Sequence, residues 1–442
     1  MSSEGFDSVL AEVLTRIVPS SQEQDRIHSI SSELVSRISV SSAFKVELEG
    51  SVAKGTWLAG SPELDVFLLF PVGTPLSDMQ KVTLQVGSAV LRDQRMSYAE
   101  HPYVRGFYDG IPVDLVPCYE VKSPSEMVSG VDRTPFHTRY INSHLTPEQK
   151  NQARLLKAFL KGLRVYGAEI RVRGFSGYAA EVMVDRFGGF RPVLEAAQGW
   201  RLGQNLGWQG RPDVLGLPDP VDPSRNVAAS VSKRSFSLFV AASGFMLRRP
   251  SPNYFFPSEL PAKKKDSSGL LVVRISPKRP GQVDDVLWGE IWRTLEGLSS
   301  SLIRRGVPVW DASAYVESDL VYLFFELESI RLPGRELVYG PPVHMQESAL
   351  RFTDKWLESS ELLRGPWVQD GRWMVIRKKA KAVKDIVMEI TREGAGLGDA
   401  FGFGPGEAEV AVGNSAFALS RSDGYKRALL QFSGKMESFL NS

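Results

Sequence analysis

The chain has 442 residues, with 43% apolar and 24% charged side chains and a formal net charge of +2. This length exceeds what one hydrophobic core usually organises, so we expect two or three domains of ordinary soluble composition. The N-terminus lacks a basic start followed by an apolar stretch, and no segment approaches the roughly 18 apolar residues that span a bilayer, which predicts a cytoplasmic protein. A single cysteine, Cys118, excludes an intrachain disulfide and a zinc site built from several thiolates.

Charge is distributed unevenly along the chain. Residues 1–143 hold 12 Lys and Arg against 18 Asp and Glu, residues 144–260 hold 16 against 9, and residues 261–442 hold 25 against 24. The three segments therefore carry −6, +7 and +1. An acidic segment that holds metal, followed by a basic segment that holds polyphosphate, would have this pattern.

Four short strands are predicted in the acidic segment, at residues 46–49, 64–70, 95–99 and 111–116. Gly50-Ser51 opens a segment of helical length that ends near Gly60, which gives a strand, helix, strand unit. Asp109-Gly110 is a turn sequence directly before the last strand.

A helix start is indicated at Thr146, because threonine caps helices, proline suits the first helical position and Gln149 completes a capping box. Leucine and phenylalanine side chains follow on one side of this helix, which ends before Gly167. The charge changes sign here, so we place the first domain boundary near residue 143.

Proline, serine and lysine gather in residues 218–223 and 250–265, which indicates loops and a second domain boundary near residue 260. Beyond that boundary we predict three strands, at residues 270–275, 312–316 and 320–328, and one helix at residues 286–305. This is a small α+β pattern.

Three carboxylates carry the sharpest chemical signal. Residues two apart on a strand point to the same side, so Glu63 and Asp65 would present their carboxylates together, and Asp114 interrupts another apolar strand. Close carboxylates repel one another unless cations neutralise them, and hard oxygen ligands favour Mg²⁺. Two such ions would activate a ribose 3′-hydroxyl and stabilise a pyrophosphate leaving group.

Two residues near Gly50 are candidates for binding a triphosphate. Ser51 stands where a helix N-cap is expected, so its hydroxyl and the following backbone amides would face the phosphates. Lys54 lies one turn further and would add a positive charge there. The sequence contains no Gly-x4-Gly-Lys-Ser/Thr loop and no motif for an organic cofactor.

Several sequence blocks resemble, in order, those of the archaeal-type (class I) CCA-adding enzymes of the DNA polymerase β nucleotidyltransferase superfamily. The blocks are Glu63 to Pro71, Tyr98 to Tyr103, Val113 to Tyr119, Val131 to His137, Arg154 to Lys157, Tyr166 to Glu169, Arg173 to Tyr178, Asp219 to Asp222 and Arg225 to Ala229. They cover residues 50–229 densely, and the resemblance is sparse beyond residue 260.

The resemblance implies an α+β protein in three parts. These are a polymerase β-type catalytic head in residues 1–143, a mainly helical central domain in residues 144–260 that completes the nucleotide pocket, and a C-terminal α+β, ferredoxin- or RNP-like body with a tail in residues 261–442 that binds tRNA. The resemblance also implies template-independent addition of C, C and A to the 3′ end of tRNA from CTP and ATP, by a homodimer that binds the acceptor stem.

Roles are implied for nine residues of this chain. Glu63, Asp65 and Asp114 match the catalytic magnesium ligands of the family. The positions that match nucleotide-binding residues are Ser51, Lys54, His137, Lys157, Tyr166 and Arg225, the last of which would help to read the incoming base. Lys54 departs from the arginine that is typical of the family, and lysine lacks the planar, bidentate fork of arginine.

Two other functions stay open from the sequence. A different polymerase β-type transferase, such as a poly(A) polymerase, would share the two-metal chemistry. A non-catalytic RNA-binding relative would keep the fold, although the carboxylate loss expected of it is absent. For RNA phosphates the candidates are the basic clusters Lys263–Lys265 and Arg377–Lys381, with Trp373 on a strand at 371–376 as a platform for the acceptor stem. The glycines of residues 394–406 indicate a loop.

Overall fold

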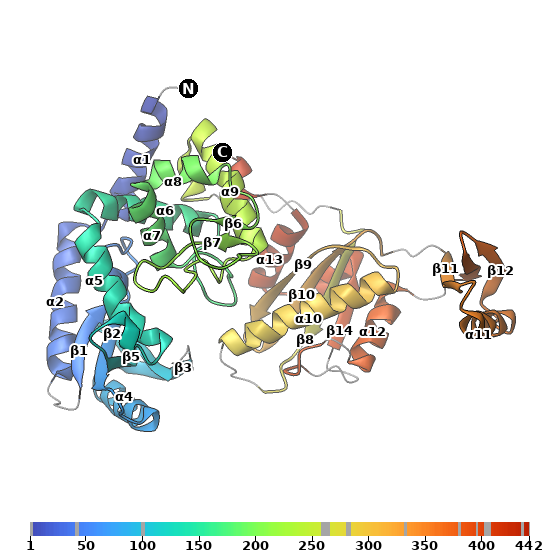
Figure 1. The fold of residues 1–442 in the computed structure, drawn as a ribbon, viewed down its shortest axis with the longest axis horizontal. Coiled ribbons are helices and arrows are strands. Elements are labelled where there is room, and N and C mark those ends of the chain that lie inside the picture. Colours follow the sequence, from blue (N-terminus) through green and yellow to red (C-terminus); the bar gives the residue numbers. More distant parts are fainter. Residues whose placement is uncertain are drawn as a thin grey trace. The chain divides into compact units, whose positions relative to one another are not determined.

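The computed structural model describes residues 3–39, 44–98, 102–257, 266–279, 284–330, 334–378, 382–394, 397–401, 408–434 and 437–441 (Figure 1). The chain forms two compact units: unit 1 comprises residues 1–260 and 437–442, and unit 2 comprises residues 261–436. Across the described ranges, no helix has the length and apolar character needed to cross a membrane.

A five-stranded sheet organises the first part of unit 1. Its strands lie in the order β1 (Lys45–Glu49), β2 (Leu64–Pro71), β5 (Ile111–Glu120), β4 (Pro102–Tyr108) and β3 (Arg92–Tyr98). Strands β2 and β5 run parallel, and the other neighbours are antiparallel. Helices α2 (Ser21–Ile38) and α4 (Leu76–Val90) contribute to the core that buries Leu64, Val66 and Val113. Successive strand residues point to opposite faces, so the side chains next to these core residues point to the other face of the sheet.

The four predicted strands of this sheet are confirmed, with two corrections. Strand β4 was not predicted, and it lies between β3 and β5, so the Asp109-Gly110 turn joins β4 to β5. The helix expected from Gly50 to Gly60 is wrong, because α3 is a single turn, Gly50–Ala53. Gly55 and Gly60 adopt positive φ values of 63° and 71°, which no right-handed helix accommodates.

The remaining part of unit 1 is mainly helical. Its helices are α1 (Ser3–Ile17), α5 (Thr134–His144), α6 (Pro147–Gly162), α7 (Gly177–Phe187), α8 (Phe190–Ala197) and α9 (Lys233–Arg248), with 3-10 turns at Pro124–Glu126, Gly130–Arg133 and Pro252–Tyr254 and a short strand pair, β6 (Gln204–Asn205) and β7 (Leu215–Gly216). The predicted capping box of α6 is present, since Thr146 and Gln149 bond each other's backbone N–H. The leucines of α6 are buried, as expected from their spacing.

Residues 437–441 also belong to unit 1. They include a 3-10 turn, Ser438–Asn441. The Phe439 ring is 3% exposed and stacks on Tyr254, with 5.5 Å between the ring centroids. The chain therefore leaves unit 1 near residue 260, forms unit 2, and returns to complete the core of unit 1.

Unit 2 contains a βαββαβ arrangement. Its elements are β8 (Leu270–Ile275), α10 (Asp284–Arg304), β9 (Val309–Glu317), β10 (Leu320–Leu327), α12 (Val383–Glu393) and β14 (Ala408–Val412). The antiparallel sheet has the order β14-β8-β10-β9, and α10 crosses in front of it in Figure 1. Helices α10 and α12 pack on one face, while a 3-10 turn (Gly413–Ala418) and α13 (Asp423–Gly434) pack on the other. The predicted ferredoxin-like body is confirmed.

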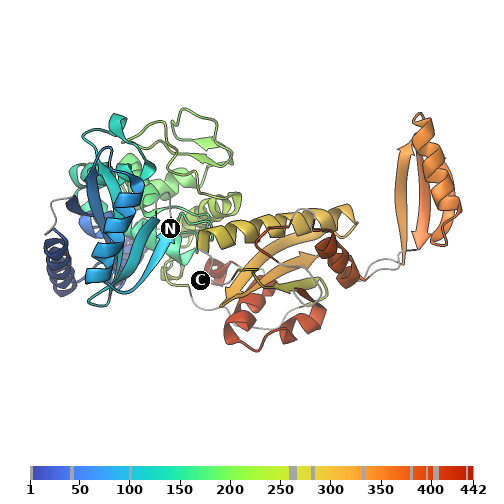
Figure 2. The same cartoon turned by 90° about the horizontal axis from the view of Figure 1, so that it is seen from below.

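A small α+β body is inserted between β10 and α12. It consists of β11 (Arg335–Pro342), α11 (Gln346–Leu357), β12 (Leu362–Gln369) and β13 (Arg372–Lys378), with strand order β11-β13-β12. Figure 2 shows α11 lying along one face of this sheet. Strand β13 confirms the strand predicted at 371–376, but the rest of the insertion was not predicted.

Candidate active site

The three predicted metal ligands lie at one edge of the unit 1 sheet. Asp65 on β2 and Asp114 on β5 are direct neighbours in the parallel register, and Glu63 immediately precedes β2 rather than lying within it. The chain passes close over Asp65 at Gly50, whose positive φ of 71° and lack of a side chain leave room for the carboxylate. The sheet thus brings together residues about fifty positions apart in sequence.

Arg105 on β4 holds two of these carboxylates. It is the register partner of Asp114, and its Nε and Nη2 atoms donate to Asp114 Oδ1 and Oδ2, both at 2.6 Å. The same Nη2 donates to Glu63 Oε1 at 2.7 Å. Charge-assisted, bidentate pairs of this kind are among the stronger hydrogen bonds in proteins. Arg105 therefore supplies positive charge where the sequence predicts cations.

The electrostatics of the site remain strongly acidic even with Arg105 in place. Burial, together with the charges of Glu63 and Asp114, raises the pKa of Asp65 to about 7. Burial and Asp114 also raise the pKa of Glu63 above its usual range. Among the described residues no three His, Cys, Asp or Glu side chains converge as a ready-made metal site, since Arg105 lies between Glu63 and Asp114. The donor set, three crowded hard-oxygen carboxylates, fits a divalent cation.

A second cluster is built around Glu181 of α7, which is fully buried. Lys54 Nζ donates to its Oε2 at 2.6 Å, and Lys157 Nζ of α6 donates to its Oε1 at 2.7 Å. The Thr56 hydroxyl donates to the same Oε1 at 2.5 Å. Burial alone would raise the pKa of Glu181, but the two lysines outweigh it and lower that pKa to about 2. The structure thus places Lys54 and Lys157, both predicted to bind the nucleotide, on one carboxylate.

A third cluster is built around Asp219, which is also fully buried. Its carboxylate accepts hydrogen bonds from His137 Nε2 at 2.9 Å, Arg225 Nη1 at 3.0 Å and the Tyr178 hydroxyl at 2.9 Å. Burial favours protonation of Asp219, but the bonds from His137, the Val221 backbone and Arg225 hold its pKa below the usual range. Burial lowers the pKa of His137, while its hydrogen bond to Asp219 acts in the opposite direction.

The tyrosine rings connect these clusters. The Tyr178 ring stacks on His137 with 3.8 Å between ring centroids, and Lys54 Nζ lies 5.5 Å from the centroid of Tyr178. Gly177 leaves the space that a side chain would take from the Tyr166 hydroxyl and from Lys157, since a Cβ there would lie 2.8 Å from that hydroxyl. Burial raises the pKa of Tyr166, which therefore stays a neutral donor.

The expected capping role of Ser51 is wrong. Glu49 occupies the N-cap position of α3 and makes no side-chain cap, and Ser51 lies inside this single turn. Ser51 is half-buried beside Gly50, one residue from the backbone that covers Asp65. Its prediction as a phosphate contact therefore rests on position next to the carboxylates and not on a helix terminus.

A pocket of about 410 Å³ opens beside Arg225. Trp208, Ser176 and Asn226 contribute to its lining. The Arg225 guanidinium forms an ion pair with Asp219, and the Arg225 side chain is 36% exposed. An aromatic ring, an arginine and small polar groups can contact a flat, polar ligand such as a nucleobase.

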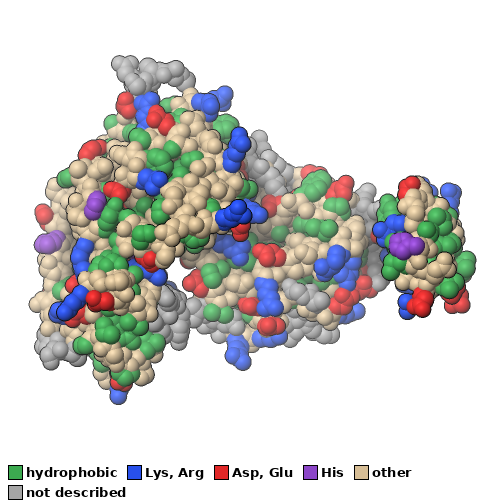
Figure 3. Space-filling model, in the orientation of Figure 1, with side chains coloured by type: hydrophobic (Ala, Val, Ile, Leu, Met, Phe, Trp, Pro, Cys, Tyr) green, Lys and Arg blue, Asp and Glu red, His purple; other side chains and the backbone are tan. Residues whose placement is uncertain are grey.

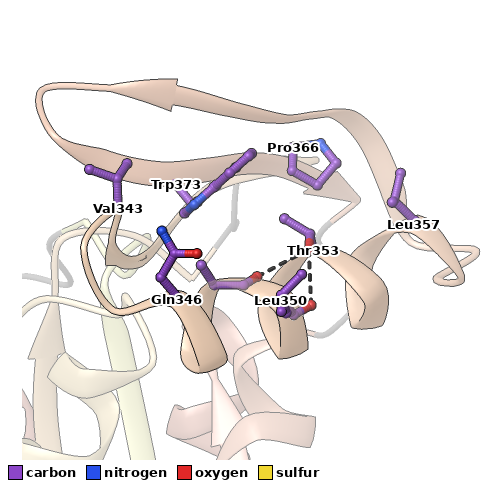
Figure 4. A pocket seen from close by; sticks show the side chains of 8 residues that line it. Val343, Gln346, Leu350, Thr353, Leu357, Pro366 and Trp373 are labelled. Atoms are coloured by element: carbon purple, nitrogen blue, oxygen red, sulfur yellow. Dashed lines mark hydrogen bonds between the residues drawn. The ribbon is translucent and has the colours of Figure 1, made fainter.

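A second cavity, of about 400 Å³, belongs to the inserted body of unit 2. In Figure 4, Trp373 and Pro366 from the strands face Gln346, Leu350 and Thr353 of α11. None of its lining residues is titratable, so it offers no acid–base or metal chemistry. Trp373 thus lines this cavity. The face of the inserted body that is visible in Figure 3 shows hydrophobic side chains between charged ones.

The predicted RNA-binding clusters are only partly described. Arg377 forms ion pairs with Glu336 and Glu361, at 2.9 Å and 3.3 Å, which offset its charge. Residues 379–381 and the whole of Lys263–Lys265 lie outside the described residues, as do 395–396 and 402–407 of the glycine-rich segment. The Tyr98 to Tyr103 block is likewise described only in part.

Four residues at the site were missed by sequence reasoning: Arg105, Tyr178, Glu181 and Asp219. Arg105 could have been found, because a two-residue Asp109-Gly110 turn makes it the cross-strand partner of Asp114. Glu181 gives a weaker signal, as one carboxylate in an otherwise apolar run of α7. Its partners are distant in sequence, so only the fold identifies them.

Three family models match consecutive parts of the chain. They are a nucleotidyltransferase domain at residues 29–137, the second domain of tRNA nucleotidyltransferase at residues 151–256, and the C-terminal domain of the CCA-adding enzyme at residues 268–401. The fold and these matches define a nucleotidyltransferase.

Proteins named CCA-adding enzyme are similar over most of the chain. The one from Haloarcula marismortui is 37% identical, covering 86% of this chain and 88% of its own length. Those from Sulfurisphaera tokodaii and Methanothermobacter thermautotrophicus are 34% and 36% identical, covering 85% and 80% of this chain and 90% and 83% of theirs. A solved structure of Cid1 poly(U) polymerase has a TM-score of 0.45 and 16% identity, and covers 57% of this chain and 97% of that one. The chain belongs to the family of archaeal-type CCA-adding enzymes.

Proposed function

We propose that the protein adds C, C and A to the 3′ end of tRNA, using CTP and ATP and no nucleic-acid template, with release of pyrophosphate. Membership of the CCA-adding family supports this function. The structural observation that carries it is the arrangement of Asp65 and Asp114 on adjacent strands, where the charge of Lys54 acts on Asp65. Lys54 and Lys157 share Glu181, and His137 and Arg225 share Asp219. This arrangement supports the proposal of acidic groups for cations beside basic groups for a triphosphate.

Members of the nucleotidyltransferase family generally use divalent metal ions, and we propose two Mg²⁺ ions held by Glu63, Asp65 and Asp114. When bound, the ions would lower the pKa of the ribose 3′-hydroxyl and neutralise charge on the phosphates. Arg105 then competes with the cations for the oxygens of Asp114 and for Oε1 of Glu63, whereas Oε2 of Glu63 accepts no bond from the guanidinium.

The other predicted residues would bind the nucleotide. Lys54 and Lys157 bring positive charge to the triphosphate, with Ser51 and Tyr166 as hydroxyl donors. His137 and Tyr178 stack beside this charge, and Arg225 lies at the rim of the pocket of about 410 Å³, where it would contact the base. Arg225 donates only, so it distinguishes bases by the acceptor atoms they present.

The remaining proposals concern organisation. We propose residues 1–143 as catalytic head, residues 144–260 as central domain, and residues 261–442 as the C-terminal part that binds the acceptor stem of tRNA. A homodimer in the cytoplasm is part of the same proposal. The similarity of unit 2 to the C-terminal domain of CCA-adding enzymes supports tRNA binding there.

The test is single-nucleotide extension of three tRNA transcripts that end before CCA, after C and after CC. With Mg²⁺ and one labelled nucleoside triphosphate at a time, we expect C, C and A in register. Long runs of A would favour a poly(A) polymerase, and no incorporation by folded protein would favour the non-catalytic relative.

A further inference from the structure

The buried cluster around Glu181 contains more positive than negative charge. Two ammonium groups, Lys54 and Lys157, share one carboxylate, and the exposed fractions of the side chains are 8%, 2% and 0% for Lys54, Lys157 and Glu181. The two lysines and Glu181 together carry one excess positive charge, which acts on Asp65 and would also favour an anionic ligand beside Lys54. The cluster therefore has the charge of a phosphate-binding site.

The hydrogen bonds of the two lysines differ. An ammonium group has three N–H donors. Lys157 uses all three, on Glu181 Oε1 at 2.7 Å, the Thr56 hydroxyl at 2.9 Å and the Thr56 carbonyl at 3.2 Å. Within the part of the chain that the structure describes, Lys54 Nζ makes one hydrogen bond, to Glu181 Oε2. Lys54 thus keeps donors for a ligand, whereas Lys157 would have to exchange one of its bonds to Thr56 or Glu181 to donate to a ligand.

Glu181 is also the point where the catalytic sheet segment meets the helical part of unit 1. Lys54 and Thr56 follow α3, beside the backbone that covers Asp65, and the charge of Lys54 lowers the pKa of Asp65. Lys157 and Glu181 come from α6 and α7. The position of the Lys54 ammonium next to the metal-binding carboxylates is therefore set by a residue of another part of the chain.

We infer that Glu181 is a positioning residue for nucleotide binding, which holds Lys54 against the triphosphate through Oε2 while Thr56 and Lys157 fix Oε1. The inference rests on the proposed function in that it takes a nucleoside triphosphate as the ligand. Glu181 itself is buried and accepts hydrogen bonds only, so it does not touch the substrate. Its effect passes through Lys54.

The test shortens the carboxylate without removing its charge. In Glu181→Asp, the carboxylate withdraws by one methylene, and Lys54 loses its anchor or moves with it. We expect the Kd for ATP, measured by titration calorimetry in the absence of tRNA, to rise about tenfold, the effect of one charge-assisted hydrogen bond. The Kd for AMP should stay unchanged, because AMP lacks the phosphates that Lys54 would contact.

A double-mutant cycle separates positioning from a general loss of structure. In a Lys54→Met background, Glu181→Asp should cause little further loss of ATP affinity, because the residue it positions is gone. Glu195→Asp is the matched control, since Glu195 makes an exposed ion pair with Arg191 on α8, and it should leave the Kd for ATP unchanged. An equal loss in both backgrounds, or none in either, overturns the inference.

A second variant keeps the test decisive if Glu181→Asp does not fold. Thr56→Val is nearly isosteric and removes the hydroxyl that donates to Glu181 Oε1 at 2.5 Å. Thr56→Val should raise the Kd for ATP and leave the Kd for AMP unchanged. The rise should disappear in the Lys54→Met background, and an unchanged Kd for ATP would contradict the inference. These titrations use no tRNA, so their results do not depend on the tRNA extension assay. If the wild-type protein failed that assay, only the proposed function would be contradicted.

Discussion

Gly50 and Asp65 are in such close contact that a Cβ atom at Gly50 would lie 1.8 Å from Oδ2 of Asp65. Gly50 comes after β1, and its neighbour strand β2 carries Asp65 opposite Glu49. The position of the Asp65 carboxylate, a predicted metal ligand, therefore depends on the absence of a side chain at Gly50.

Gly50→Ala is expected to lower the extension rate about 100-fold, because a displacement of about 1 Å at a reacting group has this effect. The rate is measured by addition of CMP to tRNA lacking CCA. Gly60→Ala is the matched control: Gly60 has the same φ of 71°, but no atom lies within 4 Å of its added Cβ. Both variants should lose about 1–2 kcal/mol of stability from backbone strain. Equal activities of the two variants would contradict the role of the contact.

Asp65→Asn and Asp114→Asn should each reduce extension by roughly 10² to 10³, as for the loss of a group that stabilises transition-state charge. Metal binding gives a second readout, since Mn²⁺ titration followed by electron paramagnetic resonance should show weaker binding by both variants. A chelator should stop the wild-type reaction and Mg²⁺ should restore it. Asp78→Asn, at an exposed position in the first turn of α4, is the control and should behave like wild type.

Arg105→Met should strengthen Mn²⁺ binding about tenfold in the absence of nucleotide. The guanidinium donates to both oxygens of Asp114 and to one of Glu63, so its positive charge competes with a cation for these carboxylates. Lys45→Met removes a cation from an exposed ion pair with Glu120 on the same sheet and should leave Mn²⁺ affinity unchanged. Weaker Mn²⁺ binding by Arg105→Met would show instead that the arginine organises the carboxylates for the metal.

Glu181 should make stability depend on pH in the acid range. Its pKa in the folded protein is about 2, below the usual 4.5, so the carboxylate stabilises the fold above pH 4.5 and this contribution is lost as pH falls towards 2. Glu181→Gln should therefore be less stable than wild type by about 3 kcal/mol at pH 7, with a smaller difference at pH 3. Urea denaturation at several pH values measures the difference, and a constant difference from pH 7 to pH 3 would speak against this assignment.

The sequence predicted those parts of the fold whose pattern is local. The apolar run of β2 identified the strand that carries Asp65, and Thr146 with Gln149 identified the start of α6. The helix after Gly50 was overpredicted, because the left-handed conformation of Gly55 ends it after one turn. No local sequence pattern identifies residues 334–378 as an insertion. The pairing of β14 with β8 shows that strands before and after these residues belong to one sheet, and this pairing is seen only in the structure.

Site residues were predicted where they lie in sequence blocks that resemble the family. Residues whose role depends on hydrogen-bond partners distant in sequence were missed. Lys157 was identified as a nucleotide-binding position only through the family resemblance, and its burial was not predicted: its side chain is 2% exposed because Glu181 compensates its charge. Asp219 lies in one of the blocks that carry the family resemblance, yet its role follows only from the convergence of His137, Tyr178 and Arg225 on its carboxylate. A single sequence gives no means of pairing such distant residues.

The return of residues 437–441 to unit 1 bears on the order in which the protein matures. Synthesis proceeds from the N-terminus, so a chain that has just released residue 260 from the ribosome still lacks Phe439, which stacks on Tyr254 in the core of unit 1. Unit 1 acquires the last side chains of its core only after all of residues 261–436 have been made. A finished unit 1, which we propose to contain the catalytic head, therefore never precedes synthesis of the part that we propose to bind tRNA.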